Sequence, residues 1–206
     1  MIHALKNVAH PWHGISPGPA CPHELVCFIE IVPTDTVKYE IDKLSGHLRV
    51  DRPQRYSNQC PALYGFIPQT YCGPRVAARA AERSGKSVPK GDGDPLDICV
   101  LSERPIVHGG CLVTAVPVGG LRMIDEGEAD DKIIAVMKDD AAYGDVTDLS
   151  AVPAALVERL RHYFLTYKTI PGSAVRKVEI AEVYGAEEAR KVIMLTREDY
   201  RAEFES

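Results

Sequence analysis

Residues 91–101, GDGDPLDICVL, join an acidic turn to an apolar run that is typical of a buried strand. The glycines let the backbone turn tightly, and Pro95 fixes its own φ angle and restricts Asp94. Carboxylates held as close as Asp92, Asp94 and Asp97 repel one another unless a cation or protons intervene. Hard divalent cations such as Mg²⁺ take oxygen ligands of this kind. The segment therefore favours a metal site at the start of a core strand over a plain acidic surface turn.

A second acidic segment, 125–131 (DEGEADD), lies between LRMI and IIAVM, which read as two buried strands. Taken alone, it would be a solvated loop. Placed at the connection of two core strands, it predicts the other half of a metal site, with two or more Mg²⁺ ions between the segments. Such metal clusters suit phosphoryl chemistry. A calcium-binding EF-hand is excluded because Leu96 stands where that loop needs an oxygen ligand.

The two acidic segments account for the net charge of the chain. The formal charge is −5, from 24 Lys+Arg and 29 Asp+Glu. The segments hold eight of the acids and no base, so 21 acids face 24 bases in the remainder. A basic-leaning remainder beside clustered acids describes a polyanionic substrate bound with cations, that is, a phosphate compound. The candidate anion ligands are Lys38, Arg52, Lys132, Tyr167 and Lys168.

Composition excludes several classes of protein. With 206 residues, 45% hydrophobic and 26% charged, the chain is typical of an ordinary globular protein of one domain or two small ones. A broad nucleic-acid interface is not expected from an acidic chain. No apolar run is long enough for a membrane span, and the N-terminus lacks the apolar stretch of a signal peptide. The six cysteines form no CxxC pair, which favours reduced thiols and a cytoplasmic location.

Hydrophobic patterning predicts an α+β protein that is mainly β. Pro153–Tyr167 and Ala186–Phe204 carry apolar residues at helical spacing. Residues 72–90 read as a surface insertion. Short strands followed by helices favour a small β-barrel or a strongly curved sheet with helices outside. The predicted strands are Leu25–Val32, Thr36–Asp42, His47–Asp51 (the hairpin partner of the preceding strand), Leu96–Leu101, Cys111–Val118, Lys132–Met137 and Lys177–Val183.

Two further patterns suggest a functional site but are better explained by local structure. Residues 84–87 (SGKS) suggest a phosphate-binding P-loop, but Ala80 stands where its first glycine belongs, so an exposed glycine turn is expected. His10 and His13 could form a metal pair, but no neighbouring carboxylate or cysteine supports one. A packed N-terminal segment around Trp12 is the better interpretation.

Together these motifs resemble the family I soluble inorganic pyrophosphatases. The specific match is to the family pattern Asp-x-Asp-Pro-x-Asp, here 92–97. Further matches follow in the family's order between about residues 25 and 180: IEI with Glu30, KYEID with Lys38 and Glu40, VDRP with Arg52, YGFIP with Tyr64, MIDEGEADDKIIAV with Asp125, Asp130 and Lys132, and HYFLTYK with Tyr167 and Lys168.

The resemblance implies a distorted five-stranded, OB-like barrel with flanking helices, in a single domain 1–206 with an N-terminal extension at about 1–24. It implies hydrolysis of pyrophosphate to two phosphates by in-line attack of a metal-bridging water or hydroxide, with several Mg²⁺ ions and Mn²⁺ or Zn²⁺ as substitutes. By position, the metal ligands are Asp92, Asp97, Asp125 and Asp130, with Glu30 supporting the metal and water network, and the base is Asp94. The phosphate ligands are Lys38, Arg52, Tyr64, Lys132, Tyr167 and Lys168, with Glu40 supporting them.

The chain departs from the commoner bacterial pattern at Cys60 and Leu63, where many members carry Tyr and Asn. A homo-oligomer is expected, without a fixed number of subunits. Two other functions stay open from the sequence: hydrolysis of another phosphoanhydride such as a nucleotide, and metal binding without catalysis. Retention of acids and bases together argues against the second, because a pure metal binder needs the acids alone.

Overall fold

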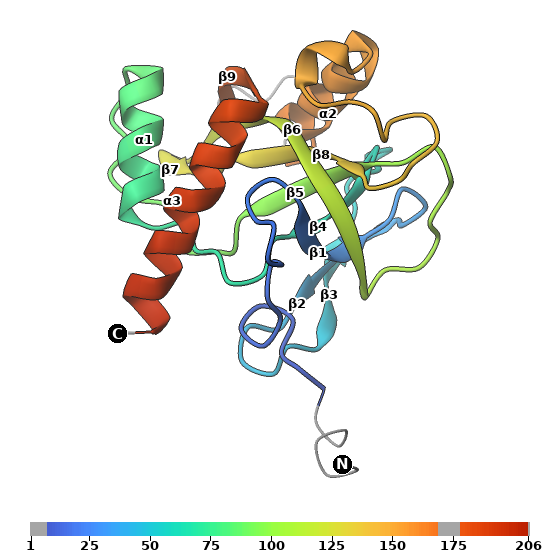
Figure 1. Cartoon of the computed structure of the whole chain (residues 1–206), viewed down its shortest axis with the longest axis horizontal. Helices are drawn as coiled ribbons and strands as arrows, with labels where there is room; N and C mark the ends of the chain where they lie inside the picture. The colour runs from blue at the N-terminus through green and yellow to red at the C-terminus, as the bar shows by residue number, and fades with distance from the viewer. Residues whose placement is uncertain (1–7, 169–177, 206) are drawn as a thin grey trace.

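The computed structural model describes residues 8–168 and 178–205. It is organised around a ring of five strands, whose arrangement can be followed in Figure 1. The hydrogen-bonded path runs β1–β4–β5–β8–β6 and returns from β6 to β1. The strands are β1 (Leu25–Ile31), β4 (Leu63–Phe66), β5 (Asp97–Leu101), β6 (Cys111–Asp125) and β8 (Lys132–Met137). This closed five-stranded ring confirms the predicted fold class.

The register of β5 and β8 positions the two acidic segments. These strands run parallel, and Asp97 lies opposite Lys132. Each acidic segment therefore ends where one strand of this pair begins. The predicted metal-site segments come together because the first residues of β5 and β8 are neighbours in the sheet.

Strand β6 joins two strands that the sequence predicts separately, because it continues past Val118 through the LRMI stretch to Asp125. Proline and glycine usually weaken a strand interior. Here the ladder shifts register between Pro117 and Gly119, which accommodates the proline in an irregular step. Beyond this step, β6 pairs with β9 (Val178–Gly185) and with the short β7 (Glu128–Ala129). The extension places Asp125 at the end of a rigid strand.

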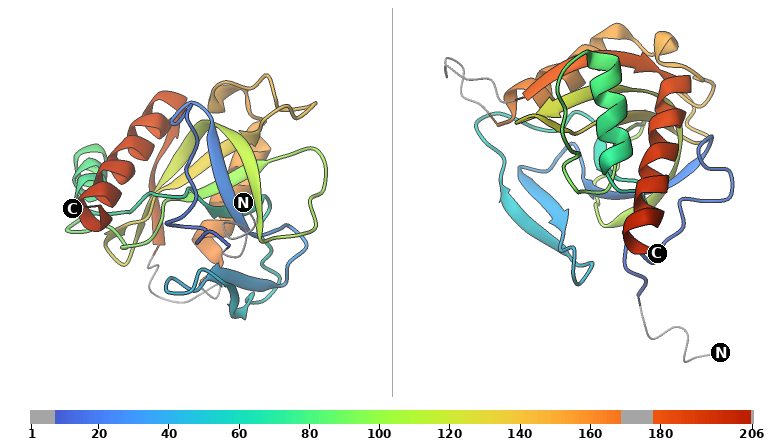
Figure 2. Two further views of the ribbon diagram at one scale, coloured as in Figure 1. Left: turned by 60° about the horizontal axis from the view of Figure 1, so that its bottom comes forward. Right: turned by 90° about the vertical axis from the view of Figure 1, so that its left-hand side faces the viewer.

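Helices α1 (Pro74–Ser84) and α3 (Ala186–Phe204) lie side by side on one side of the ring (Figures 1 and 2). Helix α2 (Ala154–Thr166) lies apart from them and packs in a second apolar core. Both predicted helices are confirmed. The predicted surface insertion 72–90 contains α1, which buries Val76, Ala77 and Ala80 in the apolar core shared with α3. Because these side chains are small, α1 can pack closely against α3. The sequence pattern did not predict this contact.

The first turn of α1 is capped from another part of the chain. Gly73, the residue before the helix, has no side chain to cap it. The buried carboxylate of Asp199 on α3 instead accepts hydrogen bonds from the backbone N–H groups of Arg75 at 3.0 Å and Val76 at 3.3 Å. A carboxylate satisfies these free donors and complements the positive end of the helix dipole.

The hairpin of β2 (Val37–Ile41) and β3 (Leu48–Pro53) is confirmed, with Tyr39 opposite Val50. Trp12 is buried and donates from Nε1 to the Thr70 carbonyl at 2.7 Å, so the packed N-terminal segment is confirmed. At the predicted glycine turn, Gly85 ends α1 in a left-handed conformation.

In the described residues, no helix is long and apolar enough to cross a membrane. The six cysteines carry free thiols. Cys60 and Leu63, where the sequence departs from the commoner pattern, are buried in the apolar cores and do not line the cavity described below. Residues 1–7 of the predicted extension and Lys177 of a predicted strand lie outside the described residues.

Candidate active site

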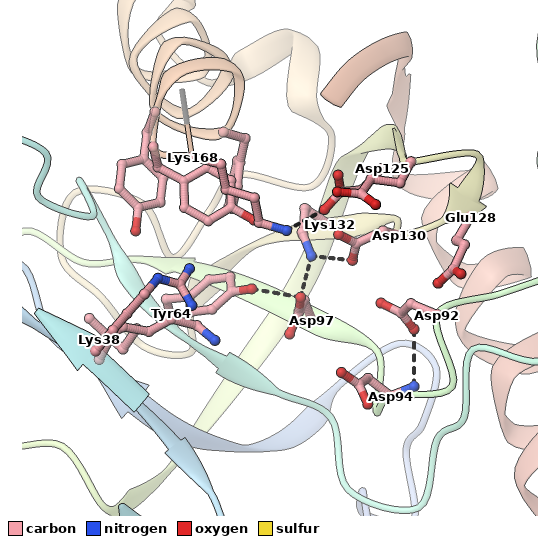
Figure 3. A pocket seen from close by; sticks show the side chains of 16 residues that line it. Lys38, Tyr64, Asp92, Asp94, Asp97, Asp125, Glu128, Asp130, Lys132 and Lys168 are labelled. Atoms are coloured by element: carbon pink, nitrogen blue, oxygen red, sulfur yellow. Dashed lines mark hydrogen bonds and ion pairs between the residues drawn. The ribbon is translucent and has the colours of Figure 1, made fainter. Parts of the chain in front are cut away.

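A cavity of about 370 Å³ opens where β5, β8 and the end of β6 meet α2 and the hairpin (Figure 3). A smaller cavity adjoins it through shared walls at Lys38, Tyr64, Asp94 and Asp97, and Glu30 and Glu40 line this second space. The structure thus brings every predicted site residue to one region. Those that line the main cavity are Lys38, Arg52, Tyr64, Asp92, Asp94, Asp97, Asp125, Asp130, Lys132, Tyr167 and Lys168.

Lys132 lies at the centre of the acidic wall, where its ammonium contacts both Asp97 and Asp130 (Figure 3). Asp97 also accepts a hydrogen bond from the Tyr64 hydroxyl at 2.6 Å. Burial alone lowers the pKa of Lys132, but Asp130 and Asp97 outweigh it and hold that pKa well above its usual value. Lys132 is therefore a permanently charged group between two carboxylates.

The turn that carries Asp92 and Asp94 is held by its own backbone. Gly93 adopts a φ of 78°, which glycine reaches without strain, and the Asp94 N–H donates to Asp92 Oδ1 at 3.0 Å. Burial, and then the charge of Asp130, raises the pKa of Asp92 to about 9. Asp94 is more exposed and pairs with Lys43. The charge of Lys132 opposes this rise in the pKa of Asp92 but does not outweigh burial and the neighbouring carboxylates.

The other acidic turn presents Asp125, which pairs with Lys168 just beyond the end of α2. Asp125 Oδ1 is buried and has no hydrogen-bond partner among the residues that the structure describes. Such a buried, unpartnered oxygen is costly unless something else satisfies it. The turn therefore offers one carboxylate oxygen to a ligand in the cavity.

The hairpin supplies the opposite wall. Lys38 pairs with Glu40 at 3.0 Å and with Asp51 at 2.9 Å, and Asp51 also contacts Arg52. Glu30, on β1 behind the hairpin, accepts from the Ile41 N–H at 2.7 Å. Burial raises the pKa of Glu30 to about 8, although the Ile41 bond opposes this change.

The donor set fits divalent cations. Within residues 8–168 and 178–205, no three His, Cys, Asp or Glu side chains converge closely enough to hold a metal ion. Lysine ammoniums contact the aspartates there: Lys132 contacts Asp97 and Asp130, and Lys168 contacts Asp125. These ammoniums offset part of the negative charge of the carboxylates. Carboxylate oxygens are the hard ligands that Mg²⁺ prefers. Asp125 Oδ1, which has no partner among the described residues, is one oxygen that could bind a metal ion.

Sequence reasoning missed three charged residues that line the cavities, Lys43, Glu126 and Glu128, and a fourth beside them, Asp51. Lys43 pairs with Asp94, and Asp51 joins Lys38 to Arg52. Glu128 lines the main cavity and pairs with Lys90 at 2.6 Å. Asp51 and Glu128 belong to motifs that the sequence analysis quotes, so their position in VDRP and DEGEADD was an available signal. Lys43 lies in a turn, and only the fold brings it to Asp94.

Five aspartates and four basic side chains around one cavity, on a small closed sheet, define a class of enzyme that handles phosphate compounds with divalent cations. The family model of inorganic pyrophosphatase matches residues 27–201. The chain belongs to the inorganic pyrophosphatase family, as its resemblance to the family I soluble members predicts.

Known proteins of this family resemble the chain over most of its length. An inorganic pyrophosphatase of Chlamydia trachomatis serovar L2 is 50% identical over 198 residues, covering 94% of this chain and 95% of the relative. Soluble inorganic pyrophosphatase 2 of Chlamydomonas reinhardtii is 38% identical, covering 91% and 86%. The crystal structure of the Thermus thermophilus inorganic pyrophosphatase superposes with a TM-score of 0.77 at 27% identity, covering 94% of this chain and 99% of that one.

Proposed function

We propose that this chain hydrolyses inorganic pyrophosphate to two phosphates in the presence of Mg²⁺. The observation that carries the proposal is the single cavity of about 370 Å³ in which five aspartates face Lys38, Arg52, Lys132 and Lys168. A site for cations alone would need the acids but not the bases. A site for anions alone would need the bases but not the acids.

The aspartates divide by exposure into two proposed roles. Asp92, Asp97, Asp125 and Asp130 lie on the inner wall and would hold the divalent cations, with Glu30 supporting them from the adjoining cavity. Bound divalent cations neutralise phosphate charge and make water more acidic. Asp94 lies nearer to solvent and would accept the proton of the attacking water. Its pairing with Lys43 would have to open before it does so.

The basic residues would bind phosphate oxygens. Lys38 and Arg52 come from the hairpin, Lys132 from β8 and Lys168 from the end of α2, so they approach the cavity from different elements. Pyrophosphate hydrolysis depends mainly on positioning and charge stabilisation, which cations on several sides supply. The hydroxyls of Tyr64 and Tyr167 would add hydrogen bonds, and Glu40 would orient Lys38.

Phosphate release from pyrophosphate and from ATP, each with Mg²⁺ or with EDTA, tests the proposal. We expect Mg²⁺-dependent release from pyrophosphate and little from ATP. Equal release from ATP would identify a general phosphoanhydride hydrolase instead. Metal binding without release from either compound would identify a metal-binding module and contradict the proposal. Replacing Mg²⁺ by Mn²⁺ or Zn²⁺ in the same assay tests the proposed substitutes.

The proposal includes a homo-oligomer, as the family resemblance implies, and a cytoplasmic location, which the free thiols favour. Light scattering after gel filtration should give a multiple of the mass of one chain, and a monomer would contradict this part. Fractionation of the source cells should recover the protein with cytoplasmic enzymes. Neither measurement depends on the catalytic assignment.

A further inference from the structure

The acidic segment 125–131 contains one carboxylate that does not reach the cavity. Successive side chains of an extended segment point to opposite faces. Asp130 and Lys132 line the cavity, so Asp131 between them points away from it. Asp131 is nevertheless almost completely buried. A buried carboxylate on the far face of a proposed metal-binding segment requires a partner there.

That partner is a cluster of charged groups between the sheet and helices α1 and α3. We call it the buried arginine cluster; its members are Arg79, Arg122, Asp131, Glu182, Tyr184 and Glu188. Arg122 is fully buried and lies 2.6 Å from Glu188, 3.2 Å from Glu182 and 3.9 Å from Asp131. Arg79 on α1 holds Glu188 by two further hydrogen bonds of 2.9 and 2.6 Å. The cluster therefore links α1, α3, β6 and β9 to the acidic segment.

Tyr184 makes the direct contact with that segment. Its hydroxyl donates to Asp131 Oδ2 at 2.9 Å, and the Arg122 guanidinium lies 5.0 Å from the centre of its ring. The ring reaches this position because β6 carries glycine at position 120. A Cβ atom there would come within 2.6 Å of the Tyr184 hydroxyl oxygen. The backbone of β6 is thus shaped to let Tyr184 reach Asp131.

We propose that Tyr184 and Arg122 are positioning residues that act through Asp131 to hold Asp130 in its orientation toward the metal ions. This inference rests on the proposed function, in which Asp130 is a metal ligand. Asp130 itself is tied to Met123 by one backbone hydrogen bond of 3.0 Å. Anchoring the next side chain on the opposite face fixes the peptide between them, and with it the direction of the Asp130 carboxylate.

The test is a calorimetric titration of Mg²⁺ into the metal-free protein, carried out without substrate. Tyr184→Phe removes the hydroxyl alone. Tyr200→Phe is the matched control, because Tyr200 is equally buried and its hydroxyl makes one hydrogen bond of 2.8 Å to His13, in the N-terminal segment rather than at the cavity. Loss of an outer hydrogen bond to a ligand typically weakens metal binding about tenfold or more. We expect this weakening in Tyr184→Phe and unchanged binding in Tyr200→Phe.

The melting temperature of both metal-free variants separates positioning from simple stabilisation. Each variant loses one hydrogen bond, which is buried at Tyr184 and partly buried at Tyr200, so both should melt somewhat below the wild type. If Tyr184→Phe melts lower but binds Mg²⁺ as the wild type does, its hydroxyl is merely structural and the proposal is wrong. Equal weakening of Mg²⁺ binding in both variants would also overturn it.

A second variant tests the link through Asp131. Asp131→Asn keeps an oxygen for Tyr184 but removes the charge opposite Arg122, so Mg²⁺ binding should weaken in the same direction. Pyrophosphate turnover by the wild-type preparation keeps the two proposals distinct. An active wild type with normal Mg²⁺ binding in Tyr184→Phe contradicts the positioning role alone, whereas an inactive wild type contradicts the proposed function.

Discussion

Two groups of charges lie back to back at the junction of β6 and β8, and they differ in their access to water. The first lines the cavity, where the side chains of Asp94 and Lys168 are 46% and 38% exposed. The second is the buried arginine cluster, where the side chains of Arg122 and Asp131 are 0% exposed. Neighbouring residues of a single segment, Asp130 and Asp131, belong to different groups.

The difference shows how one acidic segment serves two purposes. Ion pairs near water contribute little to stability, so ligands can replace them at small cost. Buried ion pairs cannot be opened without leaving a charge in an apolar setting. The exposed ion pairs of the cavity, such as Asp94 with Lys43, can therefore exchange partners, whereas the ion pairs of the fully buried Arg122 are permanent. Each of the following predictions tests one side of this contrast.

The largest effect is expected from Asp94→Asn on the cavity side. Loss of a general base typically lowers the rate by about 10²–10⁴-fold, and the exposed position of Asp94 leaves the fold intact. Phosphate release and the melting temperature measure both consequences. Asp145→Asn, at an exposed position away from the cavity, is the control and should retain full activity. Near-normal turnover in Asp94→Asn would exclude this residue as the base.

Arg122→Met should give the largest loss of stability on the buried side. It leaves Asp131, Glu182 and Glu188 without their shared cation, and breaking a buried ion pair typically costs about 3–5 kcal/mol. Denaturant unfolding measures this change. Arg104→Met removes an ion pair whose arginine is 85% exposed and should change the free energy of unfolding by less than about 1 kcal/mol. Similar losses in both variants would contradict the contrast.

Stability of the metal-free protein should decrease between about pH 5 and pH 8. Burial raises the pKa of Glu30 from 4.5 to about 8, so the folded chain binds more protons than the unfolded chain in this range. Rising pH then favours unfolding, by at most about 1.4 kcal/mol per pH unit from this group. Urea unfolding in EDTA measures the slope.

Glu30→Gln is the control for that slope. The glutamine retains an acceptor for the Ile41 N–H but does not titrate, so its profile should be flatter than that of the wild type. Identical profiles would show that Glu30 does not set the pH dependence. Glu188 in the buried arginine cluster acts in the opposite sense and at lower pH, because burial raises its pKa but Arg79 and Arg122 together lower it by more. Its contribution to stability is present above its unfolded pKa of 4.5 and is lost as the pH falls below that value.

The smallest effect is expected from Arg52→Ala, which removes one of several phosphate ligands. A hydrogen bond to a charged group contributes about 1.5 kcal/mol or more, so kcat/KM should fall about tenfold or more. Arg49→Ala on the same strand is the matched control, because Arg49 does not line the cavity. Unchanged steady-state kinetics in Arg52→Ala would mean that Arg52 is a surface charge.

Much of the fold follows from local sequence patterns. Alternation in Thr36–Asp42 predicts β2, and helical spacing in Ala186–Phe204 predicts α3 with its observed bounds. The sequence patterns predict β6 as two separate strands, Cys111–Val118 and the LRMI stretch, with Gly119 and Gly120 between them. Pairing with β8 and β9 carries the strand through these residues. Local patterns cannot show such tertiary support.

The predicted site residues cluster as expected, because their segments lead into neighbouring strands. Their partners were less predictable. Nothing in the local sequence distinguishes Asp131 from Asp130, although one is buried against Arg122 and the other faces the cavity. Lys43 reaches Asp94 from 51 residues away. Such pairings depend on the closure of the ring, which the sequence pattern does not specify.

The capping of α1 by Asp199 bears on the order in which the chain can fold. Arg75 and Asp199 are 124 residues apart, so most of the chain must leave the ribosome before the cap is available. An isolated helix of 11 residues is only marginally stable in water. We therefore expect α1 to remain unfolded during synthesis and to form when α3 docks. Pulsed hydrogen exchange on stalled chains should find the amides of α1 unprotected until Asp199 has emerged.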